Sequence, residues 1–335
     1  MKIRTETLLT SAELGDLWTS YMFDSLLVCT LKSFLQHVED PDISPLLKYT
    51  LKQSQKHVKW ITDTFNQEQL PIPVGFTDKD VNLNAPRLYS DIFYPFYLEY
   101  LAKFGMTAYS LSLPLMARSD VREFTSNSIA TSTEISNRVV EVLINKGLYV
   151  RPPYISVPKK VDFVNKKGFL GSWLGKQRPL LATEILNIFG NLRSNVVMHT
   201  FCLGLAQVAE LKDVRKHLLK GKELATNHIE ILSGIMRDED IPASTNWDAG
   251  ITDSVVAPFS EKLMMFHVTM VTTAAIIASY GASLAVTMRR DLVAAYTKLI
   301  AEMMAFAEDG INLMVDKGWL EQPPQNIDHV GLAAK

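Results

Sequence analysis

The feature that most constrains this chain is an internal duplication. The segment KGLYVRPP at 146–153 is matched by KGWLEQPP at 317–324, which lies 171 residues later. The same offset pairs ARSD at 117–120 with MRRD at 288–291. Because one offset serves several separated segments, the sequence predicts two tandem copies of one domain.

Apolar residues recur at helical spacing in both copies, and neither copy has a convincing run of alternating strand pattern. Short connections join helices one to two and three to four, while about 20 residues join helices two and three, a pattern typical of ferritin-like bundles. The predicted fold class is all-α, with two tandem ferritin-like four-helix bundles. The expected helices cover about 11–38, 44–65, 86–117 and 119–146 in copy one, and about 181–209, 213–237, 256–288 and 291–317 in copy two.

The two bundles are expected at 1–150 and 181–335, joined by an extended linker at 151–180. The linker is rich in proline, glycine and lysine, a composition that disfavours regular structure. We expect its large apolar side chains to hold it against a bundle. These are Val161, Phe163, Phe169, Leu170 and Trp173.

Composition excludes several classes of protein. A hydrophobic content of 47% and a net charge of -2 exclude a disordered chain. The balance of 34 basic against 36 acidic residues argues against a nucleic-acid partner. The two cysteines, Cys29 and Cys202, exclude a disulfide-stapled module and are expected to be buried thiols. Neither end carries a secretion or lipidation signal, so we expect a cytoplasmic location.

One segment, Leu263 to Met288, contains no Lys, Arg, Asp or Glu and is long enough to span a bilayer. Its hydrophobicity is diluted by His267 and by several Thr and Ser residues, and its counterpart in copy one carries Glu99 and Lys103. We interpret it as a buried helix packed against the other copy or a dimer mate, and we expect no membrane association.

The paired KG…PP endings, the linker sequence VDFVNKKGFL at 161–170 and the block PFSEKLMMFH at 258–267 together resemble a known family. It is the uncharacterised tandem ferritin-like family of spore-forming bacilli, whose members are often labelled spore-coat-like. The resemblance covers essentially the whole chain and implies the two-bundle fold. It implies a spore association, but no activity, since none is established for the family.

Ferritin-like bundles often hold two metal ions between Glu-x-x-His motifs on facing helices. This sequence has no Glu-x-x-His, so a di-iron site of that type is not expected. Aligning the helices of copy two by height predicts a different nitrogen and oxygen site for Fe, Mn or Zn. Its candidate ligands are His199, His228, His267, Glu302 and Glu308.

The matching positions of copy one hold only one of these ligand types, His57, so a metal site would lie in copy two alone. His57 and His228 are the histidine pair preserved across the duplication. A second interpretation is that both are buried helix histidines, hydrogen-bonded within the bundle, that set helix register. The recurring pairs Arg118–Asp120 and Arg289–Asp291 are expected to cap and bridge the corner between helices three and four.

No nucleophile motif, phosphate-binding loop or dinucleotide fingerprint is present. The leading prediction is a non-enzymatic structural or assembly protein, spore-associated, that acts through helical surfaces on other proteins or on copies of itself. The alternative is a metal-binding or metal-dependent redox protein with its site in the second bundle.

Overall fold

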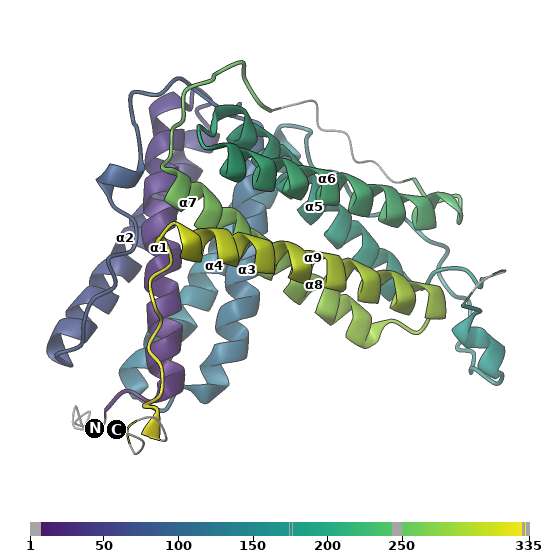
Figure 1. Ribbon diagram of the computed structural model, residues 1–335. Coiled ribbons are helices and arrows are strands. Elements are labelled where there is room, and N and C mark those ends of the chain that lie inside the picture. The colour runs from purple at the N-terminus through teal and green to yellow at the C-terminus, as the bar shows by residue number, and fades with distance from the viewer. Residues whose placement is uncertain (1–7, 174, 176, 243–249, 330–331, 333–335) are drawn as a thin grey trace.

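The computed structural model describes residues 8–173, 175, 177–242, 250–329 and 332, and most of them are helical. In Figure 1, repeat one stands upright and repeat two extends away from it. Repeat one contains α1 (Ser11–His37), α2 (Ile43–Gln67), α3 (Phe93–Ser112) and α4 (Ser119–Asn145). Repeat two contains α5 (Ala182–Val208), α6 (Lys212–Arg237), α7 (Glu261–Phe266), α8 (Thr273–Val286) and α9 (Arg290–Asp316).

The helices of each repeat contact one another in the same order. In repeat one α1 contacts α2 and α3, and α4 contacts α2 and α3; in repeat two α5 contacts α6 and α8, and α9 contacts α6 and α8. Apart from two isolated antiparallel bridges, the described residues form no β-structure. The predicted all-α fold class is therefore confirmed.

Two glutamates at the same repeat position start the first helix of each copy. The Glu13 carboxylate accepts the backbone N–H of Thr10 at 2.7 Å, and Glu184 accepts the N–H of Leu181 at 2.9 Å. Both carboxylates also reach the α3–α4 or α8–α9 corner, where they accept the backbone N–H groups of Arg118 at 2.6 Å and Arg289 at 3.3 Å. Each glutamate thus ties the start of one helix to a distant corner.

The predicted corner ion pairs are present in both copies. Arg118 pairs with Asp120 at 2.6 Å and also with Glu68. Arg289 pairs with Asp291 at 2.8 Å and with Glu239, the counterpart of Glu68. Both arginines are buried, so these carboxylates must compensate the hydration that their charges lose.

The third helix of each copy differs from the sequence expectation. α3 begins at Phe93 rather than near residue 86, because the residues before it bond to the second crossover. The N–H of Ser90 donates to the carbonyl of Gly250 at 2.7 Å, and Tyr89 forms an isolated antiparallel bridge with Ile251. In repeat two the corresponding segment is interrupted between α7 and α8 by a π-helical turn, His267–Thr272. Such turns mark local adjustments of a helix and are frequent at functional sites.

The two long crossovers pair with each other across the centre of the molecule. The N–H of Asn82 donates to the carbonyl of Pro258 at 2.8 Å, and the N–H of Thr252 donates to the carbonyl of Leu88 at 2.9 Å. At a local offset of 170 residues, one fewer than elsewhere, these two bonds exchange equivalent positions of the repeats. The repeats therefore meet with approximate two-fold symmetry, like the subunits of a symmetric dimer.

Aromatic hydroxyl groups of the first repeat bond directly to the second. Tyr89 donates to the carbonyl of Phe201 at 2.7 Å, and Tyr100 donates to the carbonyl of Thr272 at 2.6 Å. One hydrophobic core runs through both repeats as a result. The uncharged helix of copy two lies against the other copy, as predicted.

The segment Glu261–Val286 has the length and hydropathy of a membrane-spanning helix, but 67% of its most apolar window is buried inside the protein. Buried core helices commonly have these properties. Its contacts with α5, α9 and repeat one are those of a core helix.

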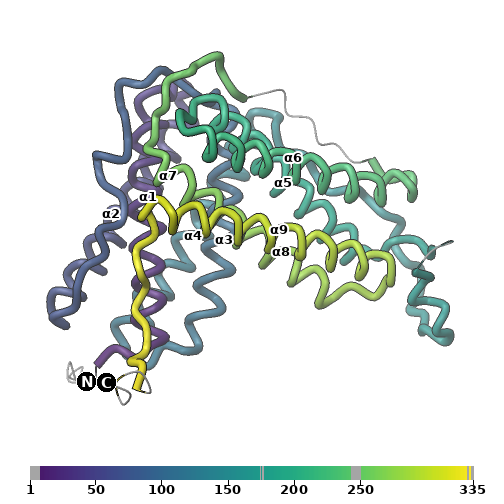
Figure 2. The backbone as a smooth tube through the Cα atoms, in the orientation of Figure 1, coloured from purple at the N-terminus to yellow at the C-terminus, as the bar shows by residue number. Residues whose placement is uncertain are grey.

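The linker does not behave as predicted. Val161 is 84% exposed and Phe163 is 82% exposed, so the expectation that they hold the linker to a bundle is wrong. The reason is that the helices of the two repeats already bury their apolar faces against one another. Phe169 is half-buried and lies 4.5 Å from the Arg178 guanidinium, whereas Trp173 is 57% exposed. Figure 2 traces the backbone of this connection.

Candidate functional site

The predicted residues His228 and Glu302 meet in the interior of repeat two. His228, on α6, lies with Nε2 3.0 Å from a Glu302 carboxylate oxygen and Nδ1 3.0 Å from the Tyr280 hydroxyl. Asn195, on α5, donates to the same hydroxyl at 2.7 Å. Burial lowers the pKa of His228, and this effect outweighs the opposing influence of Glu302. The histidine is therefore held in its neutral form by its surroundings.

The equivalent site in repeat one pairs a histidine with a carboxylate. Nδ1 of His57 lies 3.1 Å from the carboxylate of Asp24, which is 2% exposed. Burial acts against protonation, but the charge and hydrogen bond of Asp24 together raise the pKa of His57. The interpretation of His57 and His228 as hydrogen-bonded helix histidines agrees with these contacts.

The other predicted ligands lie apart from this pair. His267 is fully buried and contacts the Tyr97 hydroxyl at 2.6 Å and the Thr272 hydroxyl at 3.2 Å. His199 is half-buried and Glu308 is exposed. Within the described part of the chain, no group of three or more His, Cys, Asp or Glu side chains is arranged to hold a metal ion.

Both cysteines are buried free thiols, as expected. Burial raises the pKa of Cys29 to about 12, and it does the same for Cys202. Since the thiolate is the reactive form, neither residue has the character of a nucleophile.

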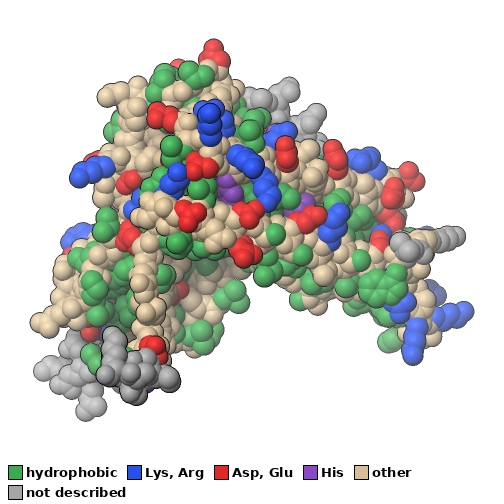
Figure 3. All heavy atoms as spheres, viewed as in Figure 1, with side chains coloured by type: hydrophobic (Ala, Val, Ile, Leu, Met, Phe, Trp, Pro, Cys, Tyr) green, Lys and Arg blue, Asp and Glu red, His purple; other side chains and the backbone are tan. Residues whose placement is uncertain are grey.

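Two exposed surfaces have complementary character. The linker residues 151–167 carry five basic side chains and one acidic one, and most are exposed. On α9, residues 299–316 carry four acidic side chains and no Lys or Arg. Figure 3 shows acidic side chains over α9 and neighbouring α6, with basic ones among them. The exposed apolar residues Met304 and Val315 lie on the same helix.

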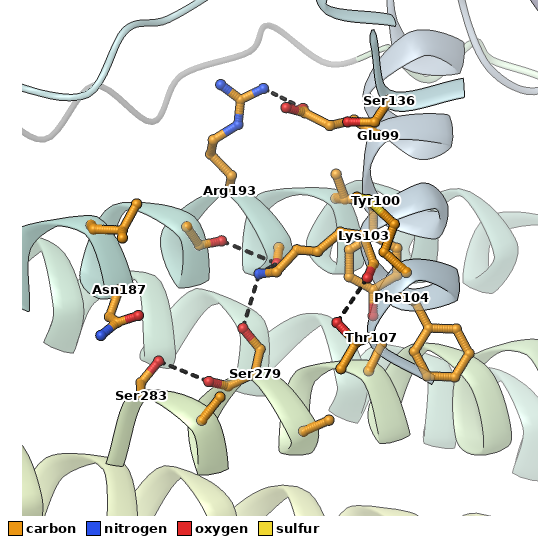
Figure 4. Close-up of a pocket in the computed structure, with 18 of the residues that line it drawn as sticks. Glu99, Tyr100, Lys103, Phe104, Thr107, Ser136, Asn187, Arg193, Ser279 and Ser283 are labelled. Atoms are coloured by element: carbon orange, nitrogen blue, oxygen red, sulfur yellow. Dashed lines mark hydrogen bonds and ion pairs between the residues drawn. The ribbon is translucent and has the colours of Figure 1, made fainter. Parts of the chain in front are cut away.

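A cavity of about 450 Å³ lies between α3 of repeat one and α5 and α8 of repeat two. Figure 4 shows Lys103 extending into it from α3. Sequence reasoning did not identify this cavity. The available signal was Lys103 itself, a single lysine within an aromatic-rich helix, which we used only as evidence against a membrane span.

These features define the class of protein: an all-helical chain built from two tandem repeats. The family described as "Protein of unknown function (DUF3231)" matches residues 1–161 and again residues 168–332. The chain belongs to this family and contains the family's domain twice.

Comparison with curated proteins finds no match. Among solved structures, the chain is similar to a "putative spore coat protein" from Bacillus halodurans, with 18% identity and a TM-score of 0.41. The alignment covers 45% of this chain and 98% of that chain.

Proposed function

We propose that this is a non-enzymatic assembly protein in which the linker of one copy docks on α9 of another copy. The observation that carries the proposal is the exposure of four large apolar side chains on the linker. Tyr154 and Val157 are each 85% exposed, Val161 is 84% exposed and Phe163 is 82% exposed.

Exposed apolar groups of this kind favour association. Fully burying a large apolar side chain contributes about 1.5–3 kcal/mol. Single exposed apolar residues are ordinary, whereas several on one segment mark an interaction site. The prolines at 152, 153 and 158 keep the segment extended, which lowers the entropy lost when it docks.

Charge selects a second copy as the partner. Five of the 34 basic residues and one of the 36 acidic residues fall in 151–167, so this segment carries +4 and the remainder of the chain -6. The exposed acidic residues Glu308 and Asp316 flank Val315 on α9. A basic, apolar segment facing an acidic, apolar helix provides the apolar contact and the opposite charges of a specific interface.

The resemblance of the sequence to spore-coat-like proteins supports a spore-associated setting for this assembly. The repeated helix contacts and the short–long–short connections support a ferritin-like bundle for each repeat.

The test is a charge swap followed by measurement of molecular mass in solution over a range of concentrations. The wild type is expected to form multimers that weaken with added salt. Lys159→Glu with Lys160→Glu should weaken association at least about tenfold, and so should Glu308→Lys with Asp316→Lys. Mixing the two variants should restore association between them.

Lys48→Glu with Lys52→Glu, on the exposed face of α2, provides a matched control that should leave the mass unchanged. A wild type that stays monomeric at its highest attainable concentration would overturn the proposal. So would multimers that both linker and α9 variants leave intact.

Metal binding stays a prediction, supported by the His228–Glu302 contact alone. Elemental analysis of protein purified without chelator tests it. About one Fe, Mn or Zn per chain, lost in His228→Ala, would support the site in repeat two.

A further inference from the structure

The cavity between the repeats has the size and lining of a small-molecule site. Its volume of about 450 Å³ lies within the range of about 300–1,000 Å³ typical of ligand pockets. Its walls are mainly apolar, and its polar groups gather around Lys103 and Arg193. The apolar side chains include Phe96, Phe104, Leu186, Val197, Ala278 and Ala282.

Small residues create the space. Ala275, Ala278 and Ala282 follow one another at helical spacing, so they line one face of α8, and Gly190 lies on α5 opposite Lys103. In the folded protein these three alanines line the cavity.

Lys103 brings a positive charge into this space without an acidic partner. Its Nζ donates to the Ser279 hydroxyl at 2.9 Å and lies 3.5 Å from the Ser194 hydroxyl. Among the described residues, no carboxylate oxygen lies within 4.0 Å of Nζ. Burial lowers the pKa of Lys103, and Glu99 only partly opposes this effect.

The two hydroxyl groups are already oriented by other bonds. Ser279 donates its proton to the side-chain oxygen of Asn191 at 2.6 Å, and Ser194 donates to the carbonyl of Gly190 at 3.1 Å. Both therefore present lone pairs to Lys103. An ammonium group has three donors, and these neutral acceptors compensate its charge less than a carboxylate would.

The nearest carboxylate is committed elsewhere. Glu99 forms an ion pair with Arg193, whose guanidinium also lies 5.8 Å from the ring centre of Phe96 and 5.6 Å from that of Tyr149. Figure 4 shows this pair beside the cavity, separate from Lys103. Two cations and one anion leave the polar side of the cavity with a net charge of +1.

We infer that the cavity binds an amphiphilic organic monoanion, whose carboxylate pairs with Lys103 and whose hydrocarbon chain lies against the alanine face of α8. The single uncompensated cation selects one negative charge, and the apolar walls select the hydrocarbon body. This binding activity is independent of the proposed assembly.

The site occurs once because the repeats diverge where they meet. The duplication offset matches Lys103 to Ala274, Arg193 to Met22 and Ser279 to Ala108. Each of these three polar groups thus has an apolar counterpart in the other copy. By contrast, both copies keep the corner ion pairs.

The experiment compares decanoate with decanol, a neutral probe of the same chain length, by isothermal titration calorimetry below the micelle concentration. Decanoate is expected to bind one per chain, at least about tenfold more tightly than decanol, which corresponds to 1.4 kcal/mol. Lys103→Met should weaken decanoate binding by a similar factor and leave decanol binding unchanged. Lys52→Met, an exposed lysine on α2, is the matched control and should alter neither.

Ala278→Phe fills the cavity and should abolish binding of both probes, with Ala282→Leu as a second filling variant should the first fail to fold. Equal affinity for decanoate and decanol would overturn the inference, as would tight decanoate binding to Lys103→Met. Absence of saturable binding, or binding that persists in both filling variants, would overturn it as well.

Discussion

His57 and His228 occupy the same position in the two repeats, yet their surroundings move their pKa values in opposite directions. His57 faces the buried carboxylate of Asp24, and its pKa is raised. Burial dominates at His228, and its pKa is lowered. The duplication offset matches Asp24 to Asn195 and Thr131 to Glu302, so the carboxylate beside the histidine comes from the first helix in repeat one and from the last helix in repeat two.

The corners of the repeats have not diverged in this way. Arg118 and Arg289 each pair with the Asp two residues later and with a Glu from the end of the second helix. Both repeats have therefore kept the ion pairs that join their helix ends. Interior charges and the surfaces between repeats were free to change.

Removing the corner arginines should have the largest effect on stability, and it tests whether the two corners are equivalent. Arg118→Ala and Arg289→Ala each leave two partly buried carboxylates without their cation and should lower the free energy of unfolding by about 3 kcal/mol. Urea unfolding followed by far-ultraviolet circular dichroism measures both. Arg138→Ala, at an exposed pair with Glu134, should cost less than about 1 kcal/mol. A cost at one corner several-fold below the other would break the equivalence.

The stability of the protein is expected to be sensitive to acid because of a buried histidine in repeat two. His217 stacks on Phe306, and burial lowers its pKa to about 4, whereas its counterpart in repeat one is Leu46. The unfolded chain takes up a proton near pH 6.5 that folded His217 does not, so stability is lost as pH falls from about 6.5 towards 4.

His217→Leu should remove this loss. The difference in unfolding free energy between variant and wild type should grow by about 2 kcal/mol in favour of the variant between pH 7.5 and pH 5. Urea titrations at the two pH values measure it. A difference that does not change with pH would show that folding leaves the pKa of His217 at its ordinary value.

Exchanging the residue types at positions 24 and 195, beside the two histidines, should have the smallest effect. Asp24→Asn should lower the pKa of His57, and Asn195→Asp should raise that of His228. Nuclear magnetic resonance titration of the histidine ring protons measures both. Shifts in the same direction in both variants would show that another group sets the difference.

The stability consequence of the Asp24 contact has a defined sign. Because the folded pKa of His57 is raised, its contribution is complete below about pH 6.5 and is lost as pH rises through the folded pKa. Asp24→Asn should therefore cost more at pH 6 than at pH 9.

Much of the architecture could be predicted from local sequence. The offset between the KG…PP endings predicted two repeats, and helical periodicity predicted the helix order. The pairs Arg118–Asp120 and Arg289–Asp291 were predictable because their members are two residues apart. The start of α3 was missed because the residues before it bond to the second crossover, about 160 residues away.

The candidate sites were less predictable. His228 and Glu302 were placed near each other by helix height alone, and the structure brings them into contact. His267 and Glu308, chosen by the same reasoning, lie apart from them, because height along a helix does not determine the direction in which a side chain points. The linker's exposure was missed because it depends on how completely the helices bury their apolar faces.

The duplication, the helical class and the ion pairs at the corners were predictable, because each follows from periodicity or from residues close in the chain. The cavity, the isolation of Lys103 and the opposite pKa shifts of His57 and His228 arise from tertiary packing. These depend on helix rotation and on partners far apart in sequence: Ser279 lies 176 residues from Lys103, and local patterns carry no record of that contact.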